Sequence, residues 1–329
     1  METIIRKKSK FIKDITMIGT KVTEEPFSLS KVIDERDGKC YVKIADSTGS
    51  LTASIPEVLA RQVDIKSISE GSVLKLTGVY MNDGMMRVLV VSAATLCNDF
   101  VPAELFAGIT NEEILSCKKG IREIISGITN PGYRALCESC LTDEVLDRMA
   151  ELPATLNLYG KYNGGCLVAT NAVSHMVLSS MASYTKRGNS FSTIRPKWNV
   201  MMSASLLFLY GNIEFFTEQA PYKRTKIGVS IGYMALLQQM LETKVYQEHI
   251  LLTAEEMAEL LNILRVSVET NTSIRATSKE GSVLRHILAL YIDSESFDWD
   301  VTTHEGGCEE EGYYYSKNLK SYIIPNTEG

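Results

Sequence analysis

The residues of this chain best suited to chemistry are two lysines and a tyrosine that alternate along a short run. In residues 39–44, Lys39, Tyr41 and Lys43 alternate with Cys40, Val42 and Ile44. Successive side chains of a β-strand point to opposite faces, so the lysines and the tyrosine share one face. A tyrosine ring can stack on an unpaired base while ammonium groups contact phosphates. A solvated strand face has the same composition, so the surrounding fold must decide between the two interpretations.

Metal and redox chemistry have few candidate residues. The chain has four histidines, far apart in sequence: His175, His249, His286 and His304. Cys137 and Cys140 form a C-x-x-C pair, but no second pair completes a zinc site, and leucines flank both cysteines. We expect this pair to be packed inside a helix. Seven cysteines without regular spacing are typical of a reducing cytoplasm rather than of a disulfide scaffold.

Short alternating runs separated by turn residues predict five strands in the first hundred residues. The runs are 27–33, 39–45, 50–55, 73–80 and 85–91. Pro56 opens a short helical stretch between the third and fourth runs, where an OB-fold barrel places its helix. The segment 37–53 also resembles the nucleic-acid-binding OB pattern G-K-x-Y-x-x-x-x-L-x-D-x-T-G-x-I-x-A. The sequence therefore predicts an OB barrel.

The barrel defines the candidate nucleic-acid contacts. On the third strand, alternation sends Leu51, Ala53 and Ile55 inward and leaves Thr52 on the outer face. A second basic group lies in the segment 186–198 and near residue 224, where lysines and arginines are interleaved with aromatic residues. A solvated loop is an equal alternative for this second group. The predicted contact residues are Lys39, Tyr41, Lys43, Thr52, Lys75, Arg87, Arg195, Lys197, Lys223 and Arg224.

From Val101 onward the apolar residues recur at helical spacing. Thr110 and Thr253 each begin a capping box, with a glutamate three residues later and an apolar stripe beyond it. The tail after residue 300 contains three consecutive glutamates and three consecutive tyrosines. We expect this tail to be flexible, with docking of a protein partner as the alternative. The predicted domains are 1–100, 101–300 and 301–329.

Two segments of the helical part resemble the core motifs of a metal phosphohydrolase. Pro153–Thr170 resembles P-A-A-x-x-x-H-H-x-Y-x-G-G-L-L-E-H-T, and Ser205–Phe216 resembles A-L-L-H-D-I-G-K-I-E-E-F. Both patterns belong to the YhaM-type 3'→5' exoribonucleases, in which an OB-fold domain precedes an HD-type metal domain. The resemblance implies an α+β, multidomain protein: an N-terminal five-stranded OB β-barrel followed by an all-α HD-like helical domain.

The resemblance also implies that the metal ligands are gone. The lysine of the second motif has become Asn212, and Asp293 is the one acidic ligand-like residue that remains. The family's histidines and aspartate fall on Tyr159, Gly160, Ala169, Phe208, Leu209 and Val229. Hydrolytic metals are held by imidazole and carboxylate groups, and these side chains carry neither. We therefore expect no catalytic metal and no other cofactor, and we expect Phe208 and Leu209 to be buried in the refilled cavity.

Composition limits the remaining possibilities. The chain has 329 residues, 45% of them hydrophobic, and a net charge of −6, so nucleic acid must be held by local basic patches. The basic N-terminus lacks the apolar stretch of a secretory signal, and Val200–Phe216 is too short and too interrupted to span a membrane. We expect a cytoplasmic protein.

The sequence favours an inactive relative of the exoribonucleases that binds single-stranded DNA or RNA. Because relatives in that family form rings, a homo-oligomeric platform is also expected. One alternative is an active metal-dependent exonuclease with unusual ligands such as Asp293 and Glu214. Another is a viral or mobile-element protein that serves only in assembly, without binding nucleic acid.

Overall fold

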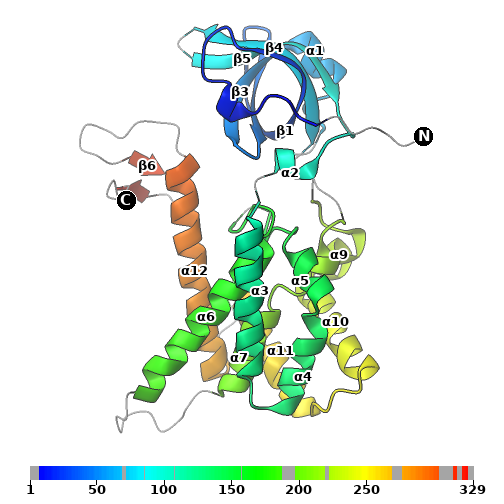
Figure 1. Ribbon diagram of the computed structural model, residues 1–329, viewed down its shortest axis with the longest axis vertical. Coiled ribbons are helices and arrows are strands. Elements are labelled where there is room, and N and C mark those ends of the chain that lie inside the picture. The colour runs from blue at the N-terminus through cyan, green and yellow to red at the C-terminus, as the bar shows by residue number, and fades with distance from the viewer. Residues whose placement is uncertain are drawn as a thin grey trace. The chain divides into compact units, whose positions relative to one another are not determined.

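The computed structural model describes residues 7–68, 72–84, 86–106, 108–156, 158–186, 197–218, 222–268, 276–303, 314–316 and 321–324. Contacts between residues divide the chain into two compact units (Figure 1). One comprises residues 1–108 with 217–223, and the other comprises 109–216 with 224–329. The first contains a β-barrel and the second is largely helical, so the predicted α+β class is confirmed.

Five strands close the barrel of the first unit. They are β1 (Lys21–Arg36), β2 (Lys39–Asp46), β3 (Gly49–Pro56), β4 (Val73–Asp83) and β5 (Met86–Leu96). Their order around the barrel is β1-β2-β3-β5-β4, and the pair β3–β5 is parallel while the others are antiparallel. Helix α1 (Glu57–Gln62) follows Pro56, as predicted. The five predicted strands are confirmed, and the barrel is consistent with an OB-like fold.

Strand β1 is longer than the predicted run and closes the barrel. Its first half pairs with β4, beginning with Lys21 opposite Val79, and its second half pairs with β2, ending with Arg36 opposite Lys39. The predicted run begins directly after Pro26, because proline lacks an N–H donor and is typical of a strand end. The residues before Pro26 were therefore missed. A register shift after Val22, where Glu24 has φ 51°, lets the strand bend.

The barrel interior confirms the predicted alternation. Val42 and Ile44 of β2 and Ala53 and Ile55 of β3 are fully buried in one apolar cluster. The outer face behaves differently from the prediction, because Tyr41 is also buried, with 5% of its surface exposed, although it is not part of that cluster. Other side chains on the outer surface of the barrel therefore cover the middle of the predicted binding face.

The OB-like D-x-T-G run fastens the N-terminal segment, which includes the short helix η1 (Ile12–Asp14). The Asp46 carboxylate accepts hydrogen bonds from the backbone N–H groups of Ile12 and Thr48, both at 2.8 Å. The Lys8 ammonium lies 3.4 Å from Asp46 and 3.3 Å from the centre of the Phe27 ring. Burial lowers the pKa of Lys8 to about 8, despite the nearby carboxylates. This part of the pattern has a structural role in the barrel.

Helices build the second unit. They are α3 (Asn111–Ser126), α4 (Pro131–Cys140), α5 (Asp143–Met149), α6 (Gly165–Lys186), α7 (Trp198–Leu207), α8 (Asn212–Phe215), α9 (Lys226–Ile231), α10 (Tyr233–Gln247), α11 (Ala254–Val268) and α12 (Lys279–Thr303). Helix α6 packs against α3, α7 and α12 (Figure 1). The capping boxes at Thr110 and Thr253 are present, and Cys137 and Cys140 are fully buried, as predicted.

The ends of the barrel and of the chain carry short elements. Helix α2 (Pro102–Leu105) follows β5 in the first unit. In the stretch predicted to be a flexible tail, β6 (Tyr314–Ser316) pairs with β7 (Ser321–Ile323), and Tyr314 and Ile323 are buried. Apolar residues at both positions explain why these two short strands are held. None of the helices in the described residues is long and apolar enough to cross a membrane.

Candidate nucleic-acid interface

Charged side chains from two turns cover Tyr41. The tyrosine hydroxyl donates a hydrogen bond to Asp83 at 2.8 Å, and the guanidinium carbon of Arg36 lies 4.7 Å from the centre of the ring. Arg36 ends β1 and Asp83 ends β4, and the Arg36 guanidinium also lies 3.8 Å from the sulfur of Met86. The predicted exposure of the Tyr41 ring is therefore wrong. The half-exposed Arg36 side chain forms the outer surface at this point.

Asp83 also holds the neighbouring lysine. The Lys39 ammonium lies 2.9 Å from both carboxylate oxygens. The hydrogen bonds from Lys39 and then Tyr41 hold the pKa of Asp83 below its usual range, and the same contact raises the pKa of Lys39. Both side chains are accessible to solvent, so water and salt screen the pair and it contributes little to the stability of the fold. Its main consequence is that the charge of Lys39 is neutralised within the protein.

A second row of polar side chains crosses the barrel beside Tyr41. Lys43 of β2 lies opposite Thr52 of β3 on one side and opposite Lys31 of β1 on the other. Lys31 is exposed, and Lys43 and Thr52 are partly exposed. Two register shifts in β1 flank Lys31, so the alternation in the sequence does not reveal that it joins this row.

The two residues predicted to flank this face lie in different places. Lys75 of β4 pairs with Pro26 of β1 and Thr95 of β5, and its contact with nucleic acid stays a prediction. Arg87 is exposed on β5, opposite Asn82 and next to the turn that follows Asp83.

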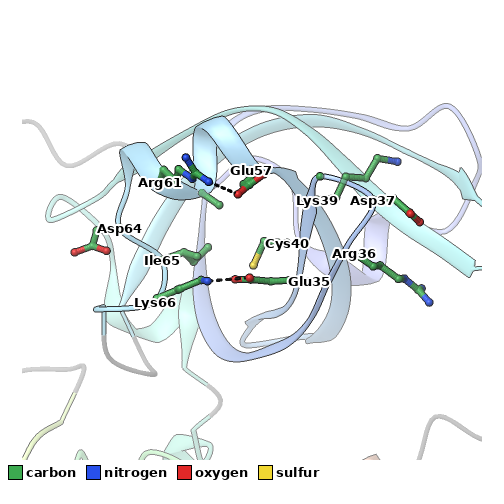
Figure 2. A pocket seen from close by; sticks show the side chains of 12 residues that line it. Glu35, Arg36, Asp37, Lys39, Cys40, Glu57, Arg61, Asp64, Ile65 and Lys66 are labelled. Carbon is green, nitrogen blue, oxygen red and sulfur yellow. Dashed lines mark hydrogen bonds and ion pairs between the residues drawn. The ribbon is translucent and has the colours of Figure 1, made fainter.

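A pocket of about 450 Å³ lies between the β1–β2 turn and α1 (Figure 2). Exposed charges at its edge pair with one another: Lys66 lies 2.8 Å from Glu35, and Arg61 pairs with Glu57. Figure 2 shows Cys40 between these two pairs. Burial raises the pKa of the Cys40 thiol, so the thiol is neutral and weakly reactive near neutral pH. The pocket offers balanced charge rather than a site for an anion.

The second basic group lies outside the barrel strands. The Lys197 side chain pairs with Glu259 of α11, and its backbone N–H donates to Glu280 at 2.7 Å. Lys223 and Arg224 are exposed between α8 and α9, and Arg224 lies 5.9 Å from the centre of the Phe215 ring. Arg195 lies outside the described residues. A nucleic-acid contact at these positions stays a prediction.

Most positions of the family's metal ligands are buried in the helical unit. Phe208 and Leu209 are 2% and 4% exposed, which confirms the expectation that both are buried. Tyr159 is also buried, and its ring meets that of Tyr291 edge to face at 5.7 Å. The Tyr233 hydroxyl donates to the backbone carbonyl of Phe208 at 2.7 Å. Ala169 is buried as well.

Val229 departs from this arrangement. It is 66% exposed on α9, so it does not take part in the buried cluster. The buried residue of α9 is Gly228, where an added β-carbon would lie 2.6 Å from the Phe215 ring. The assignment of Val229 as a former ligand position stays a prediction.

Asn212 and two glycines close the loop before α6. The Asn212 amide donates to the backbone carbonyls of Pro153 at 3.1 Å and Ala154 at 2.9 Å. The Ala154 N–H in turn donates to Gly160. A β-carbon on Gly165 would lie 2.1 Å from the Gly160 carbonyl oxygen, so only glycine fits there. Pro153, Ala154, Gly160 and Gly165 therefore shape this loop.

The carboxylates suggested for an unusual metal site are separate and face solvent. Asp293 on α12 and Glu214 on α8 are both exposed. Within the described parts of the chain, no three side chains of His, Cys, Asp or Glu lie close enough together to hold a metal ion.

Comparison with known proteins identifies no family for this chain. No protein-family model matches the chain, and none of the curated proteins is significantly similar to it. The resemblance to the YhaM-type enzymes therefore rests on the quoted motifs. At the level of fold, the chain has the two parts that the resemblance implies, a five-stranded barrel consistent with an OB-like fold and a helical region after it.

Proposed function

We propose that this protein binds single-stranded nucleic acid on the outer face of β1, β2 and β3. The observation that carries the proposal is the stack of Arg36 on Tyr41 at the centre of this face. A guanidinium plane is a stacking surface for an unpaired base, and the tyrosine fixes its position from below. The row of Lys31, Lys43 and Thr52 lies alongside, where a phosphate backbone would run.

The proposal includes the loss of hydrolysis by the helical unit. Its support is that Phe208 and Leu209 are buried and that Asn212 is hydrogen-bonded to backbone carbonyls at the positions where the family has its His-Asp pair and lysine. Neither side chain of the former pair could ligate an ion. A cytoplasmic location, a homo-oligomeric state and a protein partner for the tail belong to the same proposal.

A binding and degradation assay tests both parts of the proposal. The full-length protein is mixed with labelled oligo(dT), oligo(U) and a duplex, with and without manganese. Binding of the single strands is expected, weakening steeply as salt increases, with poor competition by the duplex because its bases are not free to stack. No shortening of the strands is expected. Shortening that depends on manganese would establish the rival interpretation of an active exonuclease, whereas failure to bind would favour a purely structural role.

Replacing Arg36 by Ala is expected to weaken binding of oligo(dT) by roughly 1–3 kcal/mol, the range found when one stacking side chain is removed. Fluorescence anisotropy of a labelled oligonucleotide measures the affinity. Arg61→Ala is the matched control, since Arg61 is an exposed arginine of the same unit that pairs with Glu57 on α1. Equal effects of the two substitutions would show that Arg36 contributes only its positive charge and does not stack on a base.

A further inference from the structure

The starting observation is that an acidic group of the protein already occupies the centre of the candidate face. Asp83 places its carboxylate 2.9 Å from the Lys39 ammonium and 2.8 Å from the Tyr41 hydroxyl oxygen. A carboxylate that accepts from an ammonium and a phenol together is arranged as two oxygens of a phosphodiester would be. The same pair of donors could therefore hold a phosphate of a bound strand.

The position of Asp83 allows such an exchange. It is the last residue of β4 and is followed by Gly84, which has φ 65°, in the turn before β5. The Lys39 and Asp83 side chains are 36% and 19% exposed, and ion pairs that solvent can reach are weak. A carboxylate held in this way can yield its partners to a phosphate without unfolding the barrel.

The neighbouring stack adds a second contact of the right chemistry. Arg36 covers the Tyr41 ring, whose hydroxyl is the one that Asp83 binds. A phosphodiester that replaced Asp83 would therefore bring its attached base close to the Arg36 guanidinium. A free inorganic phosphate could take the first contact but not the second.

We propose that Lys39 and Tyr41 form a phosphodiester subsite and that Asp83 is an internal competitor, which a single strand must displace in order to bind. This inference rests on the proposed function. It predicts that this acidic chain binds nucleic acid weakly and selectively, because only a ligand that also stacks on Arg36 offsets the loss of the Asp83 contacts. The opposite role, in which Asp83 only fixes Tyr41 beneath Arg36, leads to the opposite result in the test.

Asp83→Asn separates the two roles. Asparagine keeps the shape and an acceptor for the Tyr41 hydroxyl but cannot neutralise Lys39. Anisotropy titrations with labelled oligo(dT) over a series of salt concentrations are expected to show roughly fivefold tighter binding, since a pair of opposite unit charges about 4 Å apart in water, such as the Lys39–Asp83 pair that binding must break, is worth about 1 kcal/mol. The slope of log Kd against log salt is expected to steepen by about 0.7, the value for one added phosphate contact on a single strand.

Asp99→Asn is the matched control. Asp99 is exposed and follows β5, whereas Asp83 precedes it, so the two carboxylates lie beyond opposite ends of that strand. Both variants change the net charge equally. Equal tightening by the two would show a general charge effect and overturn the proposal.

A double-mutant cycle with Lys39→Met tests the pairing itself. In the Lys39→Met background, Asp83→Asn is expected to change affinity by less than about twofold, because the competitor has lost its partner. Circular dichroism and thermal unfolding confirm that each variant is folded. Persistence of the full gain without Lys39 would assign the effect to another residue and overturn the subsite.

The outcomes distinguish this inference from the proposed function. Wild-type binding with unchanged or weaker binding by Asp83→Asn would overturn the competitor and leave the proposed function in place. Binding by the Asp83→Asn variant but not by the wild type would support the proposal, and it would mean that Asp83 competes strongly enough to mask the face in the wild-type protein. Absence of binding by either protein would reject both proposals.

Discussion

Asn212→Asp is expected to destabilise the helical unit by roughly 3–5 kcal/mol at neutral pH, the range for a buried charge left without its partner. The Asn212 side chain is buried and donates to the carbonyls of Pro153 and Ala154. An ionised aspartate has no N–H to give and would place negative oxygens against both carbonyls. Urea unfolding followed by far-ultraviolet circular dichroism measures the loss.

The pH dependence of this variant gives a second test with a definite sign. A carboxyl group buried against carbonyl oxygens has its pKa raised in the folded state, so the folded protein binds the proton more tightly than the unfolded chain. Stability relative to the wild type is then lowest above the folded pKa and recovers as pH falls towards the unfolded value of about 3.9. The protonated carboxyl can also donate one of the two lost hydrogen bonds.

Asn212→Ala is the control, because it removes the same donors without adding a charge. It is expected to lose about 1–3 kcal/mol for the unsatisfied carbonyls, by the same amount at pH 5 and pH 7. Suppose instead that Asn212→Asp loses no more stability than Asn212→Ala and shows no recovery in acid. That result would contradict the hydrogen bonds from the Asn212 amide to this loop.

Phe208→Ala is expected to destabilise the protein by roughly 3–5 kcal/mol, as for other large core side chains cut to alanine. The Phe208 side chain is 2% exposed at the end of α7. The substitution leaves the backbone carbonyl that accepts from Tyr233, so only packing is lost. Thermal and urea unfolding of the full-length protein measure the effect.

Leu290→Ala is the matched control for this experiment. Leu290 lies on α12 and is 61% exposed, so losing its side chain is expected to change stability by no more than about 0.5 kcal/mol. Similar small losses at both positions would mean that residue 208 is not in a packed core. A large loss at Phe208 alone would show that this side chain stabilises the helical unit through its packing.

Local pattern determined much of the barrel. Alternation over residues 39–44 and 51–55 assigned the inward side chains correctly because each strand has one apolar face. Pro56 marked the start of α1, since proline is favoured at a helix beginning. The capping boxes at Thr110 and Thr253 marked the starts of α3 and α11 in the same way.

The exposure of the candidate site depends on contacts that the alternation of residue types cannot predict. Tyr41 was assigned correctly to the outer face, yet it is covered because Arg36 and Asp83, from turns far apart in sequence, meet above it. Alternation also did not show that β1 closes the barrel and brings Pro26 opposite Lys75, because that closure is a long-range event. The exposure of a side chain depends on all the elements around it, whereas the alternation of a strand shows only which of its two faces the side chain is on.

The same division holds in the helical unit. The sequence by itself determined that Phe208 and Leu209 cannot bind a metal, because the chemistry of a side chain does not depend on its surroundings. Only the tertiary structure decided that these two residues are buried while Val229 faces solvent, and that Asn212 reaches the carbonyls of Pro153 and Ala154. Residue types fix what each group can donate, accept or ligate, whereas the packing of distant segments fixes which partner it meets.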